Sequence, residues 1–396
     1  MFNAPLRSTL ALVLALAPAA PRLQACTTAI ICGKATRDGR PILWKNRDAD
    51  DLHNQVVACA DGTYAYLGIV NQGDRAGMQI WSGVNSAGFA IMNNATYNLD
   101  IDGEKTTQEG SFMKVALQTC ATVEAFQALL ERSNSGGREV SANFGVIDAQ
   151  GGAAYFETDN KGFHRFDAAA APGGFLVRGN YSHSGRKGGG TGYLREARAQ
   201  ELIQRLQSEN RLAKQDLLAE VARDTANSFS GSYPADLRKG FAFVGDSVSR
   251  EETSCAFLIQ GVAPGEAPAR TTAWVVLGLP ITGVAVPLWV SAGPVPAELA
   301  AGRALAPLNA AFERVRLAFF PFPETDRHRY LDAGRAYAPG TGLVPQLVAL
   351  ERDNLVAVDR AFAAPQPDLK ALQDGIARHT LERVEKLLKD AGLPAR

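Results

Sequence analysis

Cys26 is the residue of this sequence whose type and position are best suited to catalytic chemistry. It follows an apolar segment, STLALVLALA, that starts just after Arg7, and Leu23-Gln24-Ala25 immediately precedes it. A short basic start, an apolar core and a small residue before the cut are typical of a secretory leader. We therefore predict that residues 1–25 form a signal peptide. Its removal would make Cys26 the first residue of a periplasmic or secreted chain.

A cysteine at the first position of a chain carries two reactive groups on one residue. The thiol is a good nucleophile once it is deprotonated. The α-amine has a reference pKa of about 7.7–8.0, so a useful fraction is unprotonated near neutral pH. The amine can take the thiol proton, directly or through a water molecule, which pairs a nucleophile with a base. This pair predicts attack on a carbonyl group and a thioester that water or an amine then resolves.

Such a site needs polar groups around the cysteine. One group must hold and tune the ammonium, and hydrogen-bond donors must stabilise the negative charge that develops on the attacked oxygen. The loss of one such donor costs about 2.7–4 kcal/mol of transition-state stabilisation. We therefore expect polar donors close to the thiol.

The segment Leu23-Gln24-Ala25-Cys26 also resembles the box that precedes a lipidated cysteine in bacterial lipoproteins. Lipidation would attach a thioether to the sulfur and acylate the amine. The product would be a membrane-anchored protein with a non-catalytic binding role. A lipidated cysteine usually precedes a polar tether, whereas Cys26 continues directly into the stretch TTAIIC. The sequence favours the cleaved leader, and the lipid-anchored form is the alternative.

Short strands in hairpins are predicted for most of the chain up to about residue 296. TTAIIC and PILWKN flank Asp38-Gly39, and NFGVID and AAYFET flank Gln150-Gly151-Gly152. A pair of β-rich runs around a tight turn of this kind predicts a β-hairpin. Helical patterns interrupt the strands over residues 111–120, 122–132, 193–207 and 213–222.

The chain becomes helical after about residue 296. Residues 368–392 place leucine, isoleucine and valine on one stripe, and Gly392 suits a helix end. Strands in hairpins together with blocks of helix predict an α+β fold, in which antiparallel sheets are covered by helices.

Four short motifs follow one another along the chain. They are Cys26-Thr27-Thr28 with the Asp38-Gly39-Arg40 turn and Lys45-Asn46-Arg47-Asp48; residues 83–88 with Met92-Asn93-Asn94; residues 178–181; and residues 245–250. In this order they resemble N-terminal-nucleophile (Ntn) hydrolases of the linear-amide branch. That branch includes choloylglycine hydrolases, penicillin V acylases and the isopenicillin-N acyltransferase-like C45 peptidases. The similarity covers roughly residues 26–290.

The resemblance implies roles for individual residues. Cys26 matches the nucleophile, with its own amine as the base, and Asp48 matches the acidic residue that anchors it. Asn180 resembles the side-chain donor to the oxyanion, and Asn93 or Asn94 resembles the residue that gives a backbone N–H.

Lys45 stands where the bile-salt branch has an arginine. Lysine is a point charge where arginine offers two parallel donors, so a bidentate contact is lost at this position. Arg250 fits a family arginine near the nucleophile, although the flanking Glu251-Glu252 is unlike the bile-salt branch.

The resemblance also implies an architecture and an activity. The implied fold is an αββα four-layer sandwich. Together with the change to a helical pattern after about residue 296, it predicts a catalytic domain over residues 26–296 and a helical extension over residues 297–396 that packs on the same domain. The activity is cleavage of a linear amide C–N bond in a small acyl amide. Outside the cell hydrolysis is favoured over acyl transfer, because water is the abundant acceptor.

Bulk composition limits the other functions. The 396 residues carry a formal net charge of +0, which gives no electrostatic reason to expect nucleic acid or an anionic membrane as a partner. No apolar run reaches the roughly 18 residues of a spanning helix. None of the five histidines lies at zinc-ligand spacing, so we expect neither a metal nor a cofactor. The oligomeric state is left open.

Two further patterns have open alternatives. Besides Cys26, the sequence has Cys32, Cys59, Cys120 and Cys255, which form either up to two disulfides or plain buried thiols. Residues 98–109 match the spacing of a calcium loop, although the segment before them reads as a strand and not as an entering helix. An acidic turn before the next helix is the favoured interpretation.

Overall fold

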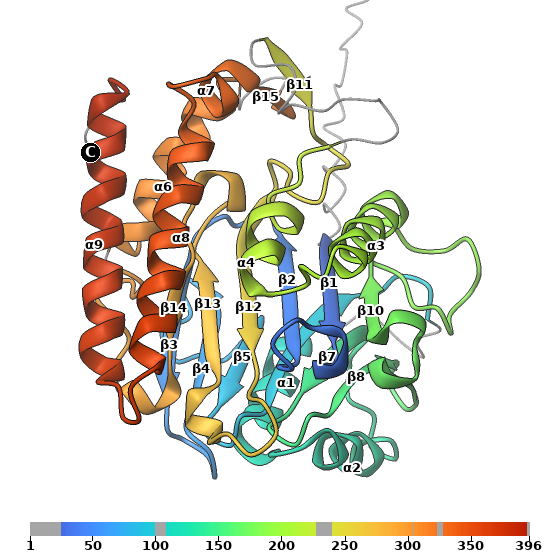
Figure 1. Cartoon of the computed structure of the whole chain (residues 1–396). Helices are drawn as coiled ribbons and strands as arrows, with labels where there is room; N and C mark the ends of the chain where they lie inside the picture. Colours follow the sequence, from blue (N-terminus) through green and yellow to red (C-terminus); the bar gives the residue numbers. More distant parts are fainter. Residues whose placement is uncertain (1–24, 100–107, 227–239, 303, 323–327, 394–396) are drawn as a thin grey trace, which may run out of the picture.

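The computed structural model describes residues 25–99, 108–226, 240–302, 304–322 and 328–393. Most of the predicted leader, the centre of the calcium-loop pattern (100–107) and residues 227–239 lie outside these ranges. Figure 1 shows the arrangement of helices and strands.

Three antiparallel sheets are present among the described residues. The larger two have the strand orders β10-β1-β2-β12-β13-β14 and β3-β4-β5-β6-β7-β8-β9, and β11 pairs with β15. The strands of the six-stranded sheet are β1 (Ala25–Ile31), β2 (Ile42–Asp48), β10 (Phe175–Arg178), β12 (Thr253–Gln260), β13 (Thr272–Val276) and β14 (Val286–Leu288). Those of the seven-stranded sheet are β3 (Asn54–Cys59), β4 (Tyr66–Asn71), β5 (Ser82–Asn85), β6 (Ala90–Ala95), β7 (Ala142–Ile147), β8 (Ala153–Thr158) and β9 (Phe163–Asp167). The short pair consists of β11 (Phe241–Phe243) and β15 (Tyr330–Asp332).

Two of the predicted hairpins are confirmed, because their glycines take the conformation that a tight turn needs. β1 and β2 pair antiparallel across a turn in which Gly39 has a φ of 76°. β7 and β8 pair across a turn in which Gly151 has a φ of 90°. Glycine adopts a positive φ without the steric penalty of a Cβ atom, so these residues set the two turns.

The two large sheets pack face to face. β1 and β2 contact β6 and β7 of the other sheet. A Cβ atom on Gly145 of β7 would come within 2.6 Å of the Met92 side chain and 3.2 Å of Ile30 on the facing sheet. The absence of a side chain at this position therefore allows the sheets to approach closely.

Helices cover the outer faces of both sheets, as Figure 1 shows. α1 packs on β5 and β6, α3 packs on β1 and β10, and α8 and α9 pack on β14. The helices are α1 (Glu109–Thr119), α2 (Val123–Ser133), α3 (Tyr193–Ser208), α4 (Lys214–Asp216) continued by a π-turn (Leu217–Val221), α6 (Pro307–Phe319), α7 (Ala333–Tyr337), α8 (Leu343–Phe362) and α9 (Leu369–Asp390). The predicted α+β class with antiparallel sheets and C-terminal helices is confirmed.

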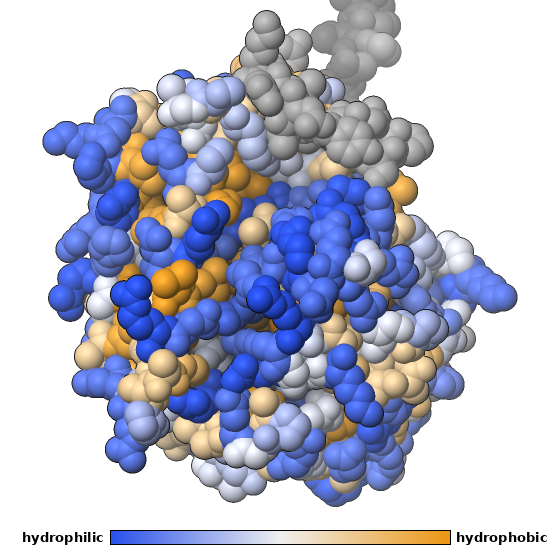
Figure 2. Space-filling view, viewed as in Figure 1, coloured by the Kyte–Doolittle hydropathy of each residue, from blue (hydrophilic) through white to orange (hydrophobic). Residues whose placement is uncertain are grey.

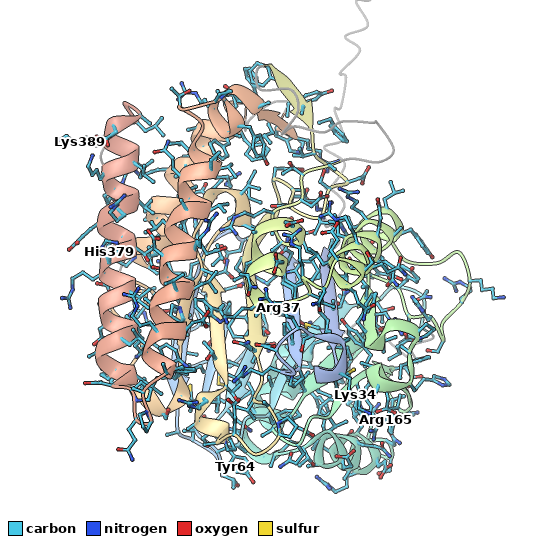
Figure 3. All side chains as sticks on the ribbon, in the orientation of Figure 1. Lys34, Arg37, Tyr64, Arg165, His379 and Lys389 are labelled. Carbon is cyan, nitrogen blue, oxygen red and sulfur yellow. The ribbon has the colours of Figure 1, made fainter. Side chains whose placement is uncertain are left out.

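α9 follows the predicted pattern closely. Asp368 caps its start by accepting a hydrogen bond from the Ala371 backbone N–H, and Gly392 follows its end with a φ of 66°. Ile376 and Val384 face the core, whereas His379 and Lys389 project into solvent from the opposite side (Figure 3). Hydrophilic residues cover much of the face of the molecule seen in Figure 2, with apolar patches among them.

The five cysteines are all free thiols, so the structure supports the alternative of plain thiols over that of disulfides. Cys26 on β1 and Cys255 on β12 both lie opposite Arg47 of the strand between them. No helix among the described residues is long and apolar enough to cross a lipid bilayer.

Candidate active site

Cys26 lies at the start of β1, one residue from the first described residue. Only 5% of its surface is exposed, and its cross-strand neighbour is Arg47. Its backbone nitrogen donates a hydrogen bond of 2.9 Å to Asn180 Oδ1, a residue 154 positions later in the chain. The Cys26 nitrogen, at the second residue of β1, is thus bound by a side chain from another segment.

The Asn180 side chain is fully hydrogen-bonded. Its oxygen accepts from the Cys26 nitrogen and from Arg195 Nη2, both at 2.9 Å. Its amide nitrogen donates to Asn94 Oδ1 at 2.7 Å and to the Ala95 carbonyl at 2.9 Å. Because a guanidinium can only donate, the amide oxygen must face Arg195 and Cys26. Asn180 therefore acts here as an acceptor for the Cys26 nitrogen, and its role as an oxyanion donor stays a prediction.

Asp48 is the buried anion of the site. Its Oδ1 accepts from Thr253 Oγ1 at 2.7 Å. Its Oδ2 accepts from Arg250 Nε at 2.8 Å and from Arg195 Nη1 at 3.4 Å. Asp48 lies opposite Ala25 in the β1–β2 ladder and reaches the Cys26 nitrogen through Arg195 and Asn180.

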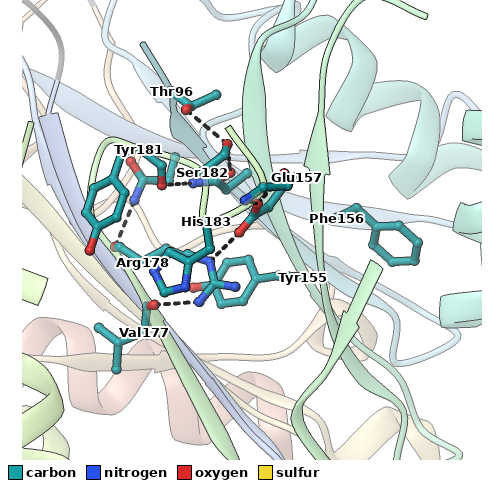
Figure 4. Close-up of polar contacts among 12 residues, drawn as sticks. Thr96, Tyr155, Phe156, Glu157, Val177, Arg178, Tyr181, Ser182 and His183 are labelled. Atoms are coloured by element: carbon teal, nitrogen blue, oxygen red, sulfur yellow. Dashed lines mark hydrogen bonds and ion pairs between the residues drawn. The ribbon is translucent and has the colours of Figure 1, made fainter. Parts of the chain in front are cut away.

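The segment that carries Asn180 is fixed from both sides. The Asn94 amide donates to the carbonyls of Arg178 and Gly179, at 2.9 and 2.6 Å. Ser182 Oγ donates to Asn143 Oδ1 at 2.6 Å and lies 3.0 Å from Thr96 Oγ1. Figure 4 shows this segment and its neighbours on β8. The dense hydrogen bonding holds the Asn180 oxygen in one place.

A buried ion pair anchors the same segment. Arg178 Nε donates to Glu157 Oε1 at 2.8 Å, and the Ser184 N–H and hydroxyl donate to Glu157 Oε2 (Figure 4). Burial alone would raise the pKa of Glu157, but Arg178 and the Ser184 hydrogen bonds bring it below its ordinary value. The carboxylate is therefore held ionised in the interior.

Replacement of Glu157 by glutamine is expected to lower the free energy of unfolding by about 3 kcal/mol, because it leaves the Arg178 charge buried without a counter-ion. Urea unfolding followed by circular dichroism measures the change. The matched control is Glu124→Gln, which removes a carboxylate that is mostly exposed and pairs with Arg165 on the surface. It should change stability by less than about 0.5 kcal/mol. Equal effects of the two substitutions would contradict the anchoring role.

Lys45 and Asn93 form a second buried contact near the nucleophile. Lys45 Nζ donates to Asn93 Oδ1 at 2.7 Å and to the Trp81 carbonyl at 2.8 Å, which ties β2 to the seven-stranded sheet. Burial lowers the pKa of the Lys45 ammonium, and the proximity of Cys26 opposes this effect. Asn93 and Asn94 thus both support the site through their side chains, on Lys45 and on Asn180 respectively.

Glu109 at the start of α1 is a further buried group close to Lys45. Burial raises its pKa to about 7, although backbone hydrogen bonds and the charge of Lys45 act in the opposite direction. In the sequence, Glu109 is the last position of the calcium-loop pattern over residues 98–109. The structure places it in a helix, and the loop's centre lies outside the described residues.

The raised pKa of Glu109 predicts a pH-dependent stability. Between the unfolded value of about 4.5 and the folded value of about 7, the folded state binds more protons, so stability contributed by this residue falls as pH rises. The free energy of unfolding of Glu109→Gln should therefore rise by about 1–3 kcal/mol relative to that of the wild type on going from pH 5 to pH 8. Chemical unfolding of both proteins at the two pH values measures this. A difference that is independent of pH would contradict it.

A cavity opens beside the Ala25–Cys26 junction. Its volume is about 470 Å³, and it is lined by Ala25, residues 191–195, Asp246, Arg250, Glu252 and Arg329. Two residues of the buried network, Arg195 and Arg250, thus face the side on which the nitrogen of Cys26 lies. Tyr193 and Leu194 at its rim are exposed apolar side chains.

The structure brings six of the seven predicted site residues into two hydrogen-bonded groups around Cys26. One group holds Asp48, Arg250, Asn180 and Asn94, and the other holds Lys45 and Asn93. Sequence reasoning missed Arg195 and Thr253, which complete the first group. The only signal for Arg195 is its position shortly after Asn180, at the start of a helix.

One cluster of possible metal ligands is present among the described residues. Glu251, Glu252 and His328 place one ligand atom each within 4.8 Å of one another. Arg329 Nε lies 2.9 Å from Glu251, and Arg250 Nη2 lies 2.9 Å from Glu252. Guanidinium groups thus already balance the two carboxylates, and we do not assign a metal to them.

Comparisons with known proteins give matches at the level of structure. A scan against protein-family models and a search of curated proteins found no match. Penicillin V acylase from Agrobacterium tumefaciens is 13% identical, with a TM-score of 0.41, over 67% of this chain and 86% of the other. A conjugated bile acid hydrolase variant from Clostridium perfringens is 12% identical, with a TM-score of 0.36, over 64% and 89%.

A third similar structure is the N-acylethanolamine-hydrolyzing acid amidase ortholog of Caenorhabditis elegans. It is 16% identical, with a TM-score of 0.34, over 46% of this chain and 79% of the other.

Proposed function

We propose that this protein is an exported N-terminal-cysteine amidohydrolase that cleaves the C–N bond of a linear acyl amide. One observation carries the proposal: a buried polar network converges on the backbone nitrogen of Cys26. The Asn180 side-chain oxygen accepts a hydrogen bond from this nitrogen and another from Arg195. Asp48 in turn accepts hydrogen bonds from Arg195 and Arg250. The Asn180 oxygen alone would satisfy the amide N–H of a cysteine within a chain, whereas the buried charges beyond Asn180 suit a nitrogen that becomes a titratable α-amine once the leader is removed.

The proposed reaction has two halves. In the first, the free α-amine of processed Cys26 takes the thiol proton, and the sulfur forms a bond to the amide carbon. The C–N bond then breaks, and the ammonium returns the proton to the leaving amine. In the second half, water gives a proton to the amine and attacks the thioester, which releases the carboxylic acid and restores the thiol.

The cavity at Ala25 indicates where the leaving amine lies. The α-amine delivers a proton to the leaving nitrogen, so that nitrogen must be within hydrogen-bond reach of it. The cavity is lined by Ala25, the residue whose carbonyl carbon is bonded to the Cys26 nitrogen, and by charged residues. We therefore place the amine half of the substrate on this side and the acyl half on the side of the Cys26 sulfur. Removal of residues 1–25 would open this side further.

Burial of Cys26 supports the enzyme over the lipid-anchored alternative. A lipidated cysteine needs its sulfur outside the protein, whereas Cys26 is 5% exposed and continues a strand between two others. Cleavage of the leader, export to the periplasm or outside the cell, and hydrolysis in preference to acyl transfer are parts of the proposal.

N-terminal sequencing and intact mass of the exported protein, followed by a panel of acyl amides, test the proposal. We expect Cys26 as the first residue with a free amine, and release of acid and amine from at least one member of the panel. Brief incubation and acid quenching should trap a mass increase equal to the acyl group. A chain that begins elsewhere, or a blocked amine, would sink the proposal.

A further inference from the structure

We propose that Arg195 is a positioning residue for the nucleophile: it holds the Asn180 amide oxygen against the Cys26 nitrogen and balances the charge of Asp48 beside it. This rests on the proposed function, in which that nitrogen is a free amine. Arg195 does not touch the sulfur in this arrangement. It acts through Asn180 and Asp48.

The contacts of Arg195 fix its guanidinium on both sides. Nη2 donates to Asn180 Oδ1 at 2.9 Å, and Nη1 lies 3.4 Å from Asp48 Oδ2. The residue is 4% exposed and lies on the first turn of α3, which packs on β1 and β10. A planar fork with two donor nitrogens holds two separate acceptors in a fixed geometry, whereas a lysine would offer both of them a single nitrogen at the end of a flexible chain.

The residue before the helix leaves room for this fork. Gly192 has a φ of 87°, and a Cβ atom there would lie 2.6 Å from Arg195 Nη2 and 3.2 Å from the Asn180 nitrogen. A side chain at position 192 would therefore displace the guanidinium or the Asn180 backbone. The local backbone and the guanidinium are thus matched to each other.

The charged and titratable groups around the Cys26 nitrogen come from several elements. They are Lys45, Arg47 and Asp48 on β2, Arg195 on α3, Arg250, Glu252 and Asp246 in the segment before β12, Cys255 on β12, Tyr97 after β6, and Glu109 on α1. Of these four carboxylates, Asp48 is the one that hydrogen bonds link to the nitrogen through only two residues, Arg195 and Asn180. An unbalanced Asp48 would favour the ammonium form and raise the pKa of the amine, so that a smaller fraction of it would be free base at a given pH.

Arg195 and Arg250 together compensate Asp48. Arg250 also binds Glu252, with Nη2 2.9 Å from that carboxylate, so it shares its charge between two anions. Arg195 binds one carboxylate and one neutral amide. It is consequently the cation whose loss would change the field at the nitrogen most directly, and it is the one that also orients Asn180.

The experiment compares processed Arg195→Met, Arg195→Lys and wild-type protein. Arg195→Met should lower kcat/KM about tenfold or more, because a hydrogen bond from a charged donor is lost. It should also move the acidic limb of the pH profile upward by about half a unit to one unit. Arg195→Lys should keep the midpoint near that of the wild type but recover the rate only in part.

The matched control is Arg198→Met on the same helix. Arg198 donates to Asp224 from Nε at 3.2 Å and from Nη2 at 2.9 Å, a comparable ion pair that is not in contact with Cys26, Asn180 or Asp48. It should cost stability without moving the pH midpoint. A pH midpoint that moves equally in both variants, or in neither, would overturn the proposal.

A second readout does not depend on turnover. Titration of the Cys26 α-amine in processed, ¹⁵N-cysteine-labelled protein, followed by NMR, should show a higher amine pKa in Arg195→Met than in the wild type. An upward shift without hydrolysis of any amide would defeat the proposed function yet support this role for Arg195. Amide hydrolysis with an unchanged titration and rate would defeat this role alone.

Discussion

Replacement of Cys26 by alanine is expected to abolish amide turnover, by at least about a thousandfold, while the chain folds and is processed as before. The reason is that the sulfur forms the only covalent bond to the acyl group in the proposed reaction. Cys26→Ser should leave weak activity, since a hydroxyl is much harder to deprotonate than a thiol. Steady-state hydrolysis of the best amide in the panel measures both variants.

The control for this prediction is another thiol of the same chain. Cys59→Ala removes a half-buried cysteine at the end of β3 and should leave kcat/KM within about a factor of two. Circular dichroism and unfolding should show that Cys26→Ala is folded, because the side chain is small and its loss creates little cavity. Wild-type rates in Cys26→Ala would remove the nucleophile from the proposal.

A blocked amine should be nearly as harmful as a missing thiol. If residues 1–25 remain attached, the Cys26 nitrogen is an amide and cannot take the thiol proton. General base catalysis contributes about 10²–10⁴-fold in rate, so the unprocessed chain should lose at least that factor. A fusion from which a protease releases Cys26 as the first residue should gain activity in step with cleavage.

A single added residue separates the amine from the leader. The same fusion with one glycine inserted before Cys26 yields, after cleavage, a chain that differs only in having the amine one residue away. Consecutive Cα atoms are about 3.8 Å apart, so this amine is displaced from the Asn180 oxygen. The glycine-extended protein should stay inactive. Full activity in it would mean that the thiol works with a different base.

Much of the fold could be predicted because turn residues and apolar periodicity coincide. Gly39 and Gly151 adopt the positive φ that their hairpins need, and the strand predicted over 153–158 has the bounds observed. β3 was missed, since its polar Asn54 and Gln55 are buried and satisfied by partners far away in the chain. β14 was missed because it is short and contains Pro287, which a sheet tolerates at an edge.

Part of the site could likewise be predicted from the sequence, and part could not. Cys26, Asp48, Asn180 and Arg250 lie in motifs that could be recognised, and hydrogen bonds connect them in the structure. Arg195 could not be predicted, because it stands in YLREARAQ, a helix whose charged residues look like a solvated face. Only the packing of α3 on β1 shows that this one arginine points inward and that Arg198 does not.

Cys26 and Cys255 both pair with Arg47 on the strand between them, and this arrangement affects how oxidants would damage Cys26. Their strands are separated by a third, so their Cα atoms lie about 9.5 Å apart, beyond the roughly 7 Å limit of a disulfide. A sulfenic acid formed on Cys26 would therefore find no resolving thiol in Cys255, and repair would depend on a small thiol from outside. If Cys26 is the nucleophile as proposed, storage under air should lower the amide-hydrolysing activity gradually, and early treatment with a reductant should restore it.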